Sequence, residues 1–231
     1  MILESAFLKI PEILLSNDDT DSLYEAYIAS VFSNAILLEL NSKNISDPMK
    51  CINLEKRYKK GENIRCDMYL DFSGIINKKM NIYGVNEKNW VEFKYFGGID
   101  RNEGNETTTE NPGKIMFDIF RLLQYAPKDE AKYFINIFND KPNKYLALKR
   151  QNGSEREWMA CLLKSGLQKI EFILDEEPNT IKKVFKGVAN LKLEVTLRNL
   201  VFEPIKISKS KNFYGYLNQI IDFKIISKKN E

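Results

Sequence analysis

Two short segments in which apolar and polar residues alternate limit what this chain can fold into. In residues 64–72 the apolar face of the alternation consists of Ile64, Cys66, Met68, Leu70 and Phe72, and the opposite face of Arg65, Asp67, Tyr69 and Asp71. In residues 89–96 one face holds Val91, Phe93 and Tyr95, and the other holds Trp90, Glu92, Lys94 and Phe96. A period of two is typical of half-buried strands, so the two segments predict a pair of neighbouring strands.

The segments around this pair predict a mixed sheet. Residues 21–40 have helical spacing of apolar side chains after the capping stretch SNDDTD, and residues 114–126 form a second amphipathic helix. Residues 50–58 are a weaker strand candidate, and residues 132–138 predict a further strand. From 21 to 138 the order is helix, strand, strand, strand, helix, strand. This order favours an α/β (α+β mixed) fold with a central sheet flanked by helices.

The rest of the chain predicts an α/β extension of this core. Helices are expected near 154–165 and 178–187, strands at 168–174 and 191–202, and a mixed segment at the C-terminus. Residues 97–113 form a long polar loop, which is usually functional or disordered when it lies inside a domain. No linker or internal repeat divides the sequence, so residues 1–231 are predicted to form a single domain, with the core at about 21–138 and 139–231 serving recognition or dimerisation.

The composition excludes several classes of hydrolase. The chain has no histidine, which excludes Ser-His-Asp and Cys-His triads, histidine-bound zinc and nucleases with a histidine base. No nucleotide-binding glycine loop is present, and three scattered cysteines suggest neither a disulfide framework nor a zinc cluster. The N-terminus lacks the pattern of a signal peptide, and no apolar run is long enough to span a bilayer. We therefore expect a cytoplasmic protein that does not insert into membranes.

The polar faces of the two strands carry a constellation suited to phosphodiester hydrolysis. A hairpin would place Asp67 and Glu92 side by side, and Lys94 projects from the same face as Glu92. Mg²⁺ prefers hard oxygen ligands, which the two carboxylates and the backbone carbonyl of Phe93 could provide. Lys94 could orient a water or stabilise charge on the phosphate. The alternative is a surface hairpin with a cross-strand ion pair.

Asp67 followed by Glu92-Phe93-Lys94 resembles the signature of the PD-(D/E)XK nuclease superfamily, which includes most type II restriction endonucleases. The order of predicted elements also resembles its αβββαβ core. The resemblance implies that Asp67 and Glu92 bind Mg²⁺, for which Mn²⁺ may substitute, and that Lys94 is the catalytic lysine. Cys66 stands where the name of the superfamily places proline.

Several further residues are open candidates for the site. Many members of the superfamily use a helix-borne glutamate as an extra metal ligand, and the match is Glu25, with Glu39 as a competitor nearer the end of the helix. Asp71 shares a face with Asp67 and could replace it, although it lies near the end of the strand. A pair on the later helix, Asp118 and Arg121, could support the site or contact phosphate, or form an ion pair on the helix surface.

These observations predict a Mg²⁺-dependent endodeoxyribonuclease, of the type II restriction kind, that acts on double-stranded DNA as a homodimer. Basic residues gather in two stretches, 43–65 and 203–231, and aromatic side chains interleave in the second: Phe213, Tyr214 and Tyr216. Such stretches can contact phosphates and bases. The same features allow a non-catalytic nucleic-acid-binding or assembly module, or a repair or recombination nuclease that acts on ends or branched DNA.

Overall fold

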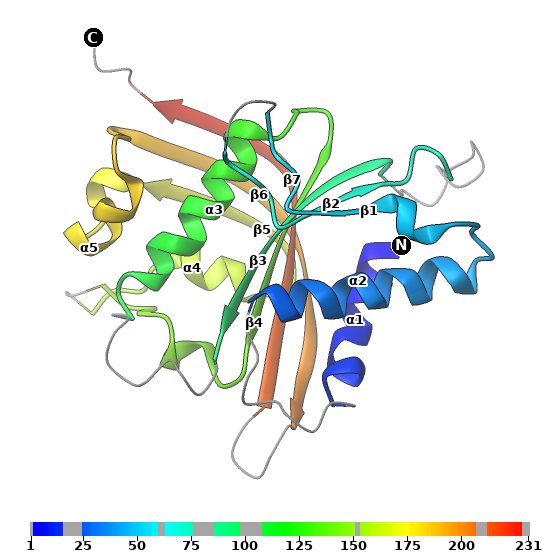
Figure 1. Cartoon of the computed structure of the whole chain (residues 1–231). Helices are drawn as coiled ribbons and strands as arrows, with labels where there is room; N and C mark the ends of the chain where they lie inside the picture. The colour runs from blue at the N-terminus through cyan, green and yellow to red at the C-terminus, as the bar shows by residue number, and fades with distance from the viewer. Residues whose placement is uncertain are drawn as a thin grey trace.

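The chain forms one seven-stranded mixed sheet with helices on both faces (Figure 1). The structure is a computed structural model that describes residues 2–15, 25–59, 63–75, 86–97, 108–150, 153–206 and 212–227. The strands lie in the order β1-β2-β3-β4-β7-β6-β5. The predicted α/β class, with a mixed sheet flanked by helices, is therefore confirmed.

The elements follow one another along the whole chain. The helices are α1 (Ile2–Leu15), α2 (Glu25–Ser42), α3 (Asn111–Tyr125), α4 (Glu157–Leu162) and α5 (Asn179–Lys182). The strands are β1 (Ile52–Leu54), β2 (Met68–Asp71), β3 (Lys88–Phe96), β4 (Ala131–Phe138), β5 (Gly166–Ile173), β6 (Leu191–Lys206) and β7 (Asn212–Ser227). Short 3₁₀ turns are η1 (Pro48–Cys51), η3 (Pro142–Lys144), η4 (Leu174–Glu176) and η5 (Lys183–Phe185).

Strand β3 lies at the change of direction in the sheet. It pairs antiparallel with β2, where Met68 is opposite Val91, and parallel with β4, where Glu92 is opposite Phe134. Parallel neighbours need a crossover, and α3 provides it between β3 and β4. Pro112, in the first turn of α3, has a fixed φ that suits the start of a helix. The register of β3 thus fixes which of its side chains face α3.

Alternation along β3 divides the core into two apolar clusters, one on each face of the sheet. One face packs against α1 and α2 and includes Val91, Phe93 and Tyr95 of β3. The other face packs against α3, α4 and the segment around α5, and it includes Trp90 and Phe96. Glu92 and Lys94 are therefore placed on the α3 side of the sheet, as the period of two requires.

Most predicted elements are confirmed, with shifted ends. The exception in the core is the strand at 64–72, of which only Met68–Asp71 is regular, because the chain bends at Asp67. This bend places Cys66 in the α3-side cluster together with Tyr69, and not on the same face as Met68. The predicted alternation is therefore wrong at Cys66, and Tyr69 is buried where a polar, exposed face was expected.

Two elements were not predicted from the sequence. Helix α1 covers the same face as α2, and the C-terminal segment that was expected to be mixed forms β7. Because β7 lies between β4 and β6, residues 139–231 continue the same sheet as the core. Residues 21–24 of the predicted first helix and 98–107 of the predicted polar loop lie outside the described residues. Within the described part of the chain, no helix has the length and apolar character needed to cross a membrane.

Two aromatic side chains of the basic C-terminal stretch are part of the core. Phe213 and Tyr216 are buried in the sheet, at 0% and 7% exposure. Tyr216 meets Phe138 edge-to-face, with ring centroids 5.8 Å apart. These two rings complete the core beside β4, and contact of the C-terminal stretch with nucleic acid stays a prediction.

We predict that α1 is an integral part of the core. Phe7 is fully buried, with its ring centroid 5.2 Å from that of Phe202 on β6. Phe7→Ala is expected to lower the free energy of unfolding by about 3–5 kcal/mol, through lost burial and the cavity left behind. Leu8→Ala, at a neighbouring position that is 51% exposed, serves as the control and should cost about 1 kcal/mol or less. Equal effects of the two variants in urea denaturation would contradict this packing.

Candidate functional site

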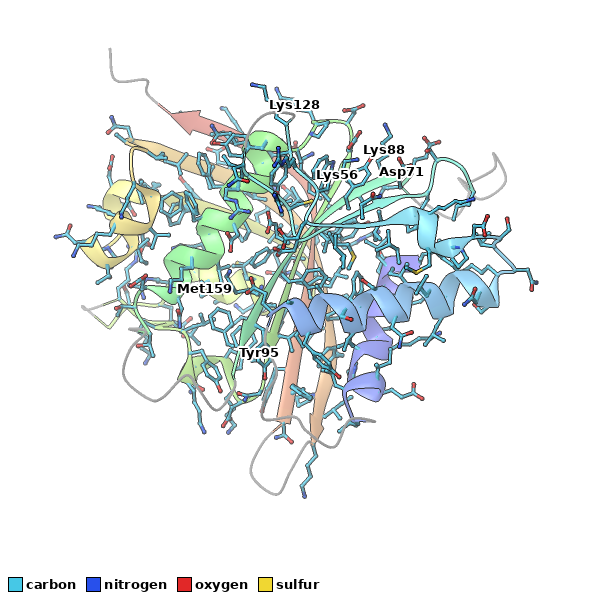
Figure 2. The ribbon with its side chains drawn as sticks, in the orientation of Figure 1. Lys56, Asp71, Lys88, Tyr95, Lys128 and Met159 are labelled. Carbon is cyan, nitrogen blue, oxygen red and sulfur yellow. The ribbon has the colours of Figure 1, made fainter. Side chains whose placement is uncertain are left out.

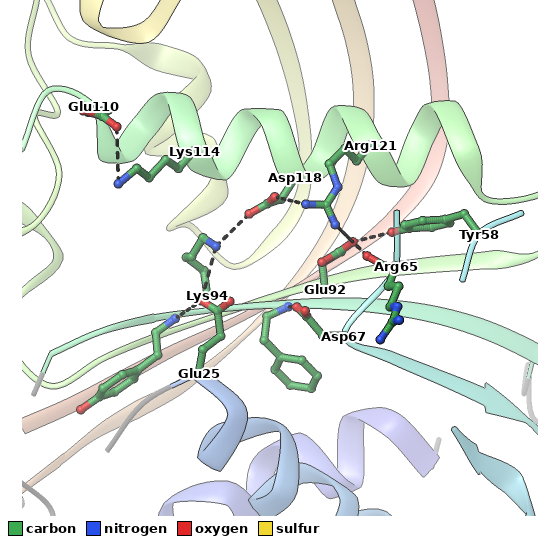
Figure 3. Close-up of polar contacts among 12 residues, drawn as sticks. Glu25, Tyr58, Arg65, Asp67, Glu92, Lys94, Glu110, Lys114, Asp118 and Arg121 are labelled. Carbon is green, nitrogen blue, oxygen red and sulfur yellow. Dashed lines mark hydrogen bonds and ion pairs between the residues drawn. The ribbon is translucent and has the colours of Figure 1, made fainter. Parts of the chain in front are cut away.

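The polar residues of β3 meet those of α3 between sheet and helix (Figure 3). Lys94 Nζ lies 3.0 Å from Asp118 Oδ2, and Arg121 Nη2 lies 3.0 Å from Glu92 Oε1. Arg121 Nη1 also contacts Asp118 Oδ1 at 3.2 Å. Two residues spaced by two on a strand thus face two residues spaced by three on a helix, and opposite charges alternate around the group.

Asp67 joins this group from the bend before β2. Its Oδ2 accepts a hydrogen bond from the backbone N–H of Phe93 at 2.7 Å. The carboxyl groups of Asp67 and Glu92 are also within hydrogen-bonding reach of each other. The prediction that Asp67 and Glu92 lie side by side is confirmed, although their catalytic role stays a prediction.

Glu92 is the most enclosed member of the group, with 2% of its surface exposed. Its Oε1 accepts a hydrogen bond from the Tyr58 hydroxyl at 2.5 Å as well as from Arg121. The Tyr58 ring stacks on Trp90 with centroids 5.0 Å apart, which fixes the direction of the hydroxyl. Arg121 Nη2 donates a second bond to the backbone carbonyl of Arg65. Glu92 is thus held from two sides by groups that sequence spacing does not connect.

Lys94 is held between two carboxylates. Besides Asp118, it contacts Glu25 Oε2 at 3.4 Å, and the same oxygen accepts a bond from the N–H of Tyr95. Glu25 is at the start of α2, so α2 and α3 reach Lys94 from opposite sides (Figure 3). The structure therefore brings Glu25 to the predicted site, but as the partner of the lysine.

Burial and crowding of like charges set the protonation of this group. Burial, reinforced by the neighbouring Asp67, raises the pKa of Glu92 well above its ordinary value. Burial also raises the pKa of Asp67 and of Glu25. Although burial opposes the charged form of Lys94, Asp118 and Glu25 raise the pKa of its ammonium group above the ordinary value. Lys94 is therefore a fixed positive charge at neutral pH.

The group carries more negative than positive charge. Four carboxylates share the group with two cations, Lys94 and Arg121, so full ionisation leaves a charge of −2. Burial is the main cause of the raised pKa values and the neighbouring carboxylates add to it, while a divalent ion would offset the negative charge. Mg²⁺ commonly takes one or two protein carboxylates, and Asp67 with Glu92 is such a pair.

Fewer of the predicted metal ligands come together than expected. Among the described residues, no group of three or more cysteine, aspartate or glutamate side chains could hold a metal. Glu25, predicted as a metal ligand, is directed to Lys94 instead. The backbone carbonyl of Phe93 lies on a strand paired on both sides, and its role as a ligand stays a prediction.

The two competing acids lie elsewhere. Asp71 binds the backbone N–H and hydroxyl of Ser73 and lies near Lys88 and Lys56 (Figure 2). Glu39 forms ion pairs with Lys9 at 2.6 Å and Lys43 at 3.5 Å. Asp67 is therefore the aspartate beside Glu92, and Glu25 is the helix glutamate beside Lys94.

One member of the group, Tyr58, was not assigned to it from the sequence. Tyr58 is 34 residues before Glu92 and ends a segment that carried only a weak strand pattern. Arg121 makes the predicted ion pair with Asp118 on its own helix, and it also reaches Glu92. From the sequence, Asp118 and Arg121 could support the site or form an ion pair on the helix, and the structure shows the ion pair together with the contact to Glu92.

The chain was compared with models of protein families, with curated proteins and with solved structures, and none of them matched. The geometry and electrostatics of this group are therefore the basis on which a function can be inferred.

The charge on Glu92 should make the stability of the chelator-treated protein depend on pH. An acid whose pKa is higher in the folded state binds more protons when folded, so stability falls as pH rises above its ordinary pKa of 4.5. The contribution approaches a slope of about 1.4 kcal/mol per pH unit between the unfolded and folded pKa values. Glu92→Gln should remove this contribution, as measured by urea denaturation across pH.

Glu12→Gln, an exposed position on α1, is the control and should leave the pH profile of the wild type unchanged. A Glu92→Gln profile parallel to that of the wild type from pH 4.5 to pH 8 would contradict the shifted pKa.

Proposed function

We propose that this chain is a Mg²⁺-dependent endodeoxyribonuclease that hydrolyses phosphodiester bonds of double-stranded DNA. The observation that supports it most is the side-by-side placement of Asp67 and Glu92, with the charged Lys94 two residues along β3. The buried Glu92, the partly buried Asp67 and the adjacent fixed cation Lys94 fit a metal-assisted phosphoryl transfer, in which a bound cation would favour the ionised carboxylates.

The element order supports a restriction-endonuclease-like core within this proposal. Helix α2 is followed by antiparallel β1, β2 and β3, then by α3 and the parallel strand β4. This agrees with the αβββαβ order implied by the resemblance of Asp67 and Glu92-Phe93-Lys94 to the PD-(D/E)XK superfamily. We propose a type II restriction activity, with two copies of the chain supplying the two sites that a duplex cut needs.

The residues of the group have separate tasks in this proposal. Asp67 and Glu92 would hold Mg²⁺, which would polarise the phosphate and lower the pKa of a water. Lys94 stays protonated, so it stabilises negative charge on the phosphate and does not act as a base. Glu25 and Asp118 orient the Lys94 ammonium from two sides. The N–H of Phe93 fixes the Asp67 carboxylate.

Plasmid cleavage tests the proposal. Wild-type protein with Mg²⁺ should cut supercoiled DNA, and Mn²⁺ should substitute, whereas a chelator should stop the reaction. Asp67→Asn and Lys94→Met should each lower the cleavage rate by about 100-fold or more, because each removes charge that acts on the reacting phosphate.

Asp71→Asn is the matched control, because Asp71 ends β2, which follows directly after Asp67, and binds Ser73 outside the group. It should retain cleavage. Cleavage that survives Asp67→Asn would overturn the site. Linear, circular and branched substrates compared in the same assay would separate a restriction enzyme from a repair or recombination nuclease that acts on ends or branched DNA.

A second candidate is a non-catalytic nucleic-acid-binding module. One observation favours it: Glu92 Oε1 already accepts bonds from Tyr58 and Arg121, and no set of three metal-ligating acids occurs in the described part of the chain. Some folds keep a sheet of this kind without its chemistry.

This module is expected to bind DNA without a metal and to release it as salt rises, because the attraction comes from lysine and arginine contacts to phosphate. Fluorescence anisotropy with a labelled duplex in chelator, from about 50 to 200 mM salt, measures this dependence. Binding combined with an absence of cleavage in Mg²⁺ and Mn²⁺ would favour the module over the nuclease.

A further inference from the structure

A pocket lies at the N-terminal end of α3, away from the candidate site. It has a volume of about 500 Å³ and is lined by residues that include Thr109, Lys149, Arg150, Arg156, Glu177 and Thr180. Helices α3 and α5 approach closely beside it, since a Cβ added at Gly113 would lie 3.1 Å from the backbone of Ile181. This close approach places α5, which includes Thr180, beside the first turn of α3.

The lining carries more positive than negative charge. Glu177 is the one acid among the lining residues that the structure describes. Its carboxylate is 3.0 Å from Arg156 Nε, 2.9 Å from Trp158 Nε1 and 3.5 Å from Arg150 Nη2. Arg156 also donates to the carbonyls of Ala147 and Lys149, so its charge belongs to the wall. Apart from Arg156, the positive charges of Lys149 and Arg150 thus exceed the single negative charge of Glu177.

Two buried donors at this pocket have no hydrogen-bond partner among the described residues. They are Nε of Arg150 and Oγ1 of Thr180. Arg150 places only its Nη2 near acids, 3.5 Å from Glu177 and 3.7 Å from Glu176. Buried polar atoms are nearly always bonded, so two unbonded donors at one basic pocket call for a ligand with several acceptor oxygens. A tetrahedral oxyanion provides them, and arginine is the side chain best suited to it.

We propose that this pocket binds a phosphate group, with Arg150 Nε and Thr180 Oγ1 as donors and Lys149 as the nearby charge. The phosphate belongs either to a DNA strand or to a small phosphorylated molecule, and only the first case rests on the proposed nuclease function. Asp118 of the candidate site is about 10 Å along α3 from its N-terminus. With a rise of about 3.4 Å per nucleotide, a strand in the candidate site would present its phosphate to the pocket about three nucleotides away.

Titration with inorganic phosphate, followed by isothermal calorimetry at low salt, tests the pocket directly. The wild type should bind phosphate saturably at one site. Arg150→Gln should weaken binding about tenfold, because it removes one charge-assisted hydrogen bond. Lys186→Gln, an exposed position just after η5, is the matched control for lost charge and should change affinity less than about twofold.

Thr180→Val separates binding from folding. The Thr180 hydroxyl is buried and unbonded, so a methyl group in its place should leave the thermal midpoint unchanged or slightly higher. The same variant should weaken phosphate binding several-fold, which a purely structural threonine would not do. The proposal is overturned if phosphate does not bind the wild type, or if Lys186→Gln weakens it as much as Arg150→Gln.

A duplex binding assay on Asp67→Asn protein in chelator identifies the source of the phosphate without requiring cleavage. Loss of duplex affinity in Arg150→Gln, parallel to the loss of phosphate affinity, assigns the pocket to the DNA strand. Unchanged duplex affinity with lost phosphate affinity assigns it to a small phosphorylated molecule. Because neither readout involves cleavage, failure of the nuclease proposal and failure of the phosphate pocket remain distinguishable.

Discussion

Burial of Glu92 beneath α3 is the constraint on which the arrangement of the polar group depends. Its position on β3 is fixed by the flanking apolar residues Val91 and Phe93, which pack on the opposite face. A carboxylate placed there by strand geometry must find partners, because an unpaired buried charge is costly. Arg121 and Tyr58 supply them, and Arg121 in turn holds Asp118 toward Lys94. One enclosed acid therefore organises α3 against β3.

Stability of the fold does not by itself explain this group. Replacing a buried ion pair with apolar residues of similar volume is often neutral or stabilising, so a strand meant only to pack would not need Glu92 and Lys94. The two apolar clusters already cover both faces of the sheet. Three neighbouring carboxylates with raised pKa values also oppose folding at neutral pH. Their presence together is easier to explain by a positively charged ligand than by packing.

The parts of the structure that could be predicted from the sequence are those with a strong local period. Strand β3 and helix α3 have such periods, and the pairing of Asp67 with Glu92 follows from two adjacent strands. Helix α1 was missed because Pro11 stands inside it, at a position where a proline usually ends a helix. Strand β7 was missed because its position beside β4 is set by non-local pairing. Tyr58 reaches Glu92 from a segment outside the regular strands, where no local pattern indicates its direction.

Arg121 and a divalent cation would compete for the same carboxylate oxygen of Glu92. For the group to accept the cation, Glu92 must exchange the bond from Arg121 for the metal, while the bond from Tyr58 can stay. Arg121 already has two other acceptors, Asp118 and the carbonyl of Arg65, so it keeps hydrogen bonds when it releases Glu92. Release would also direct a guanidinium toward the phosphate that accompanies the metal, where planar donors fit well. In the proposed nuclease, the ion pair between Arg121 and Glu92 would thus be the state without metal, in which Arg121 supplies the positive charge.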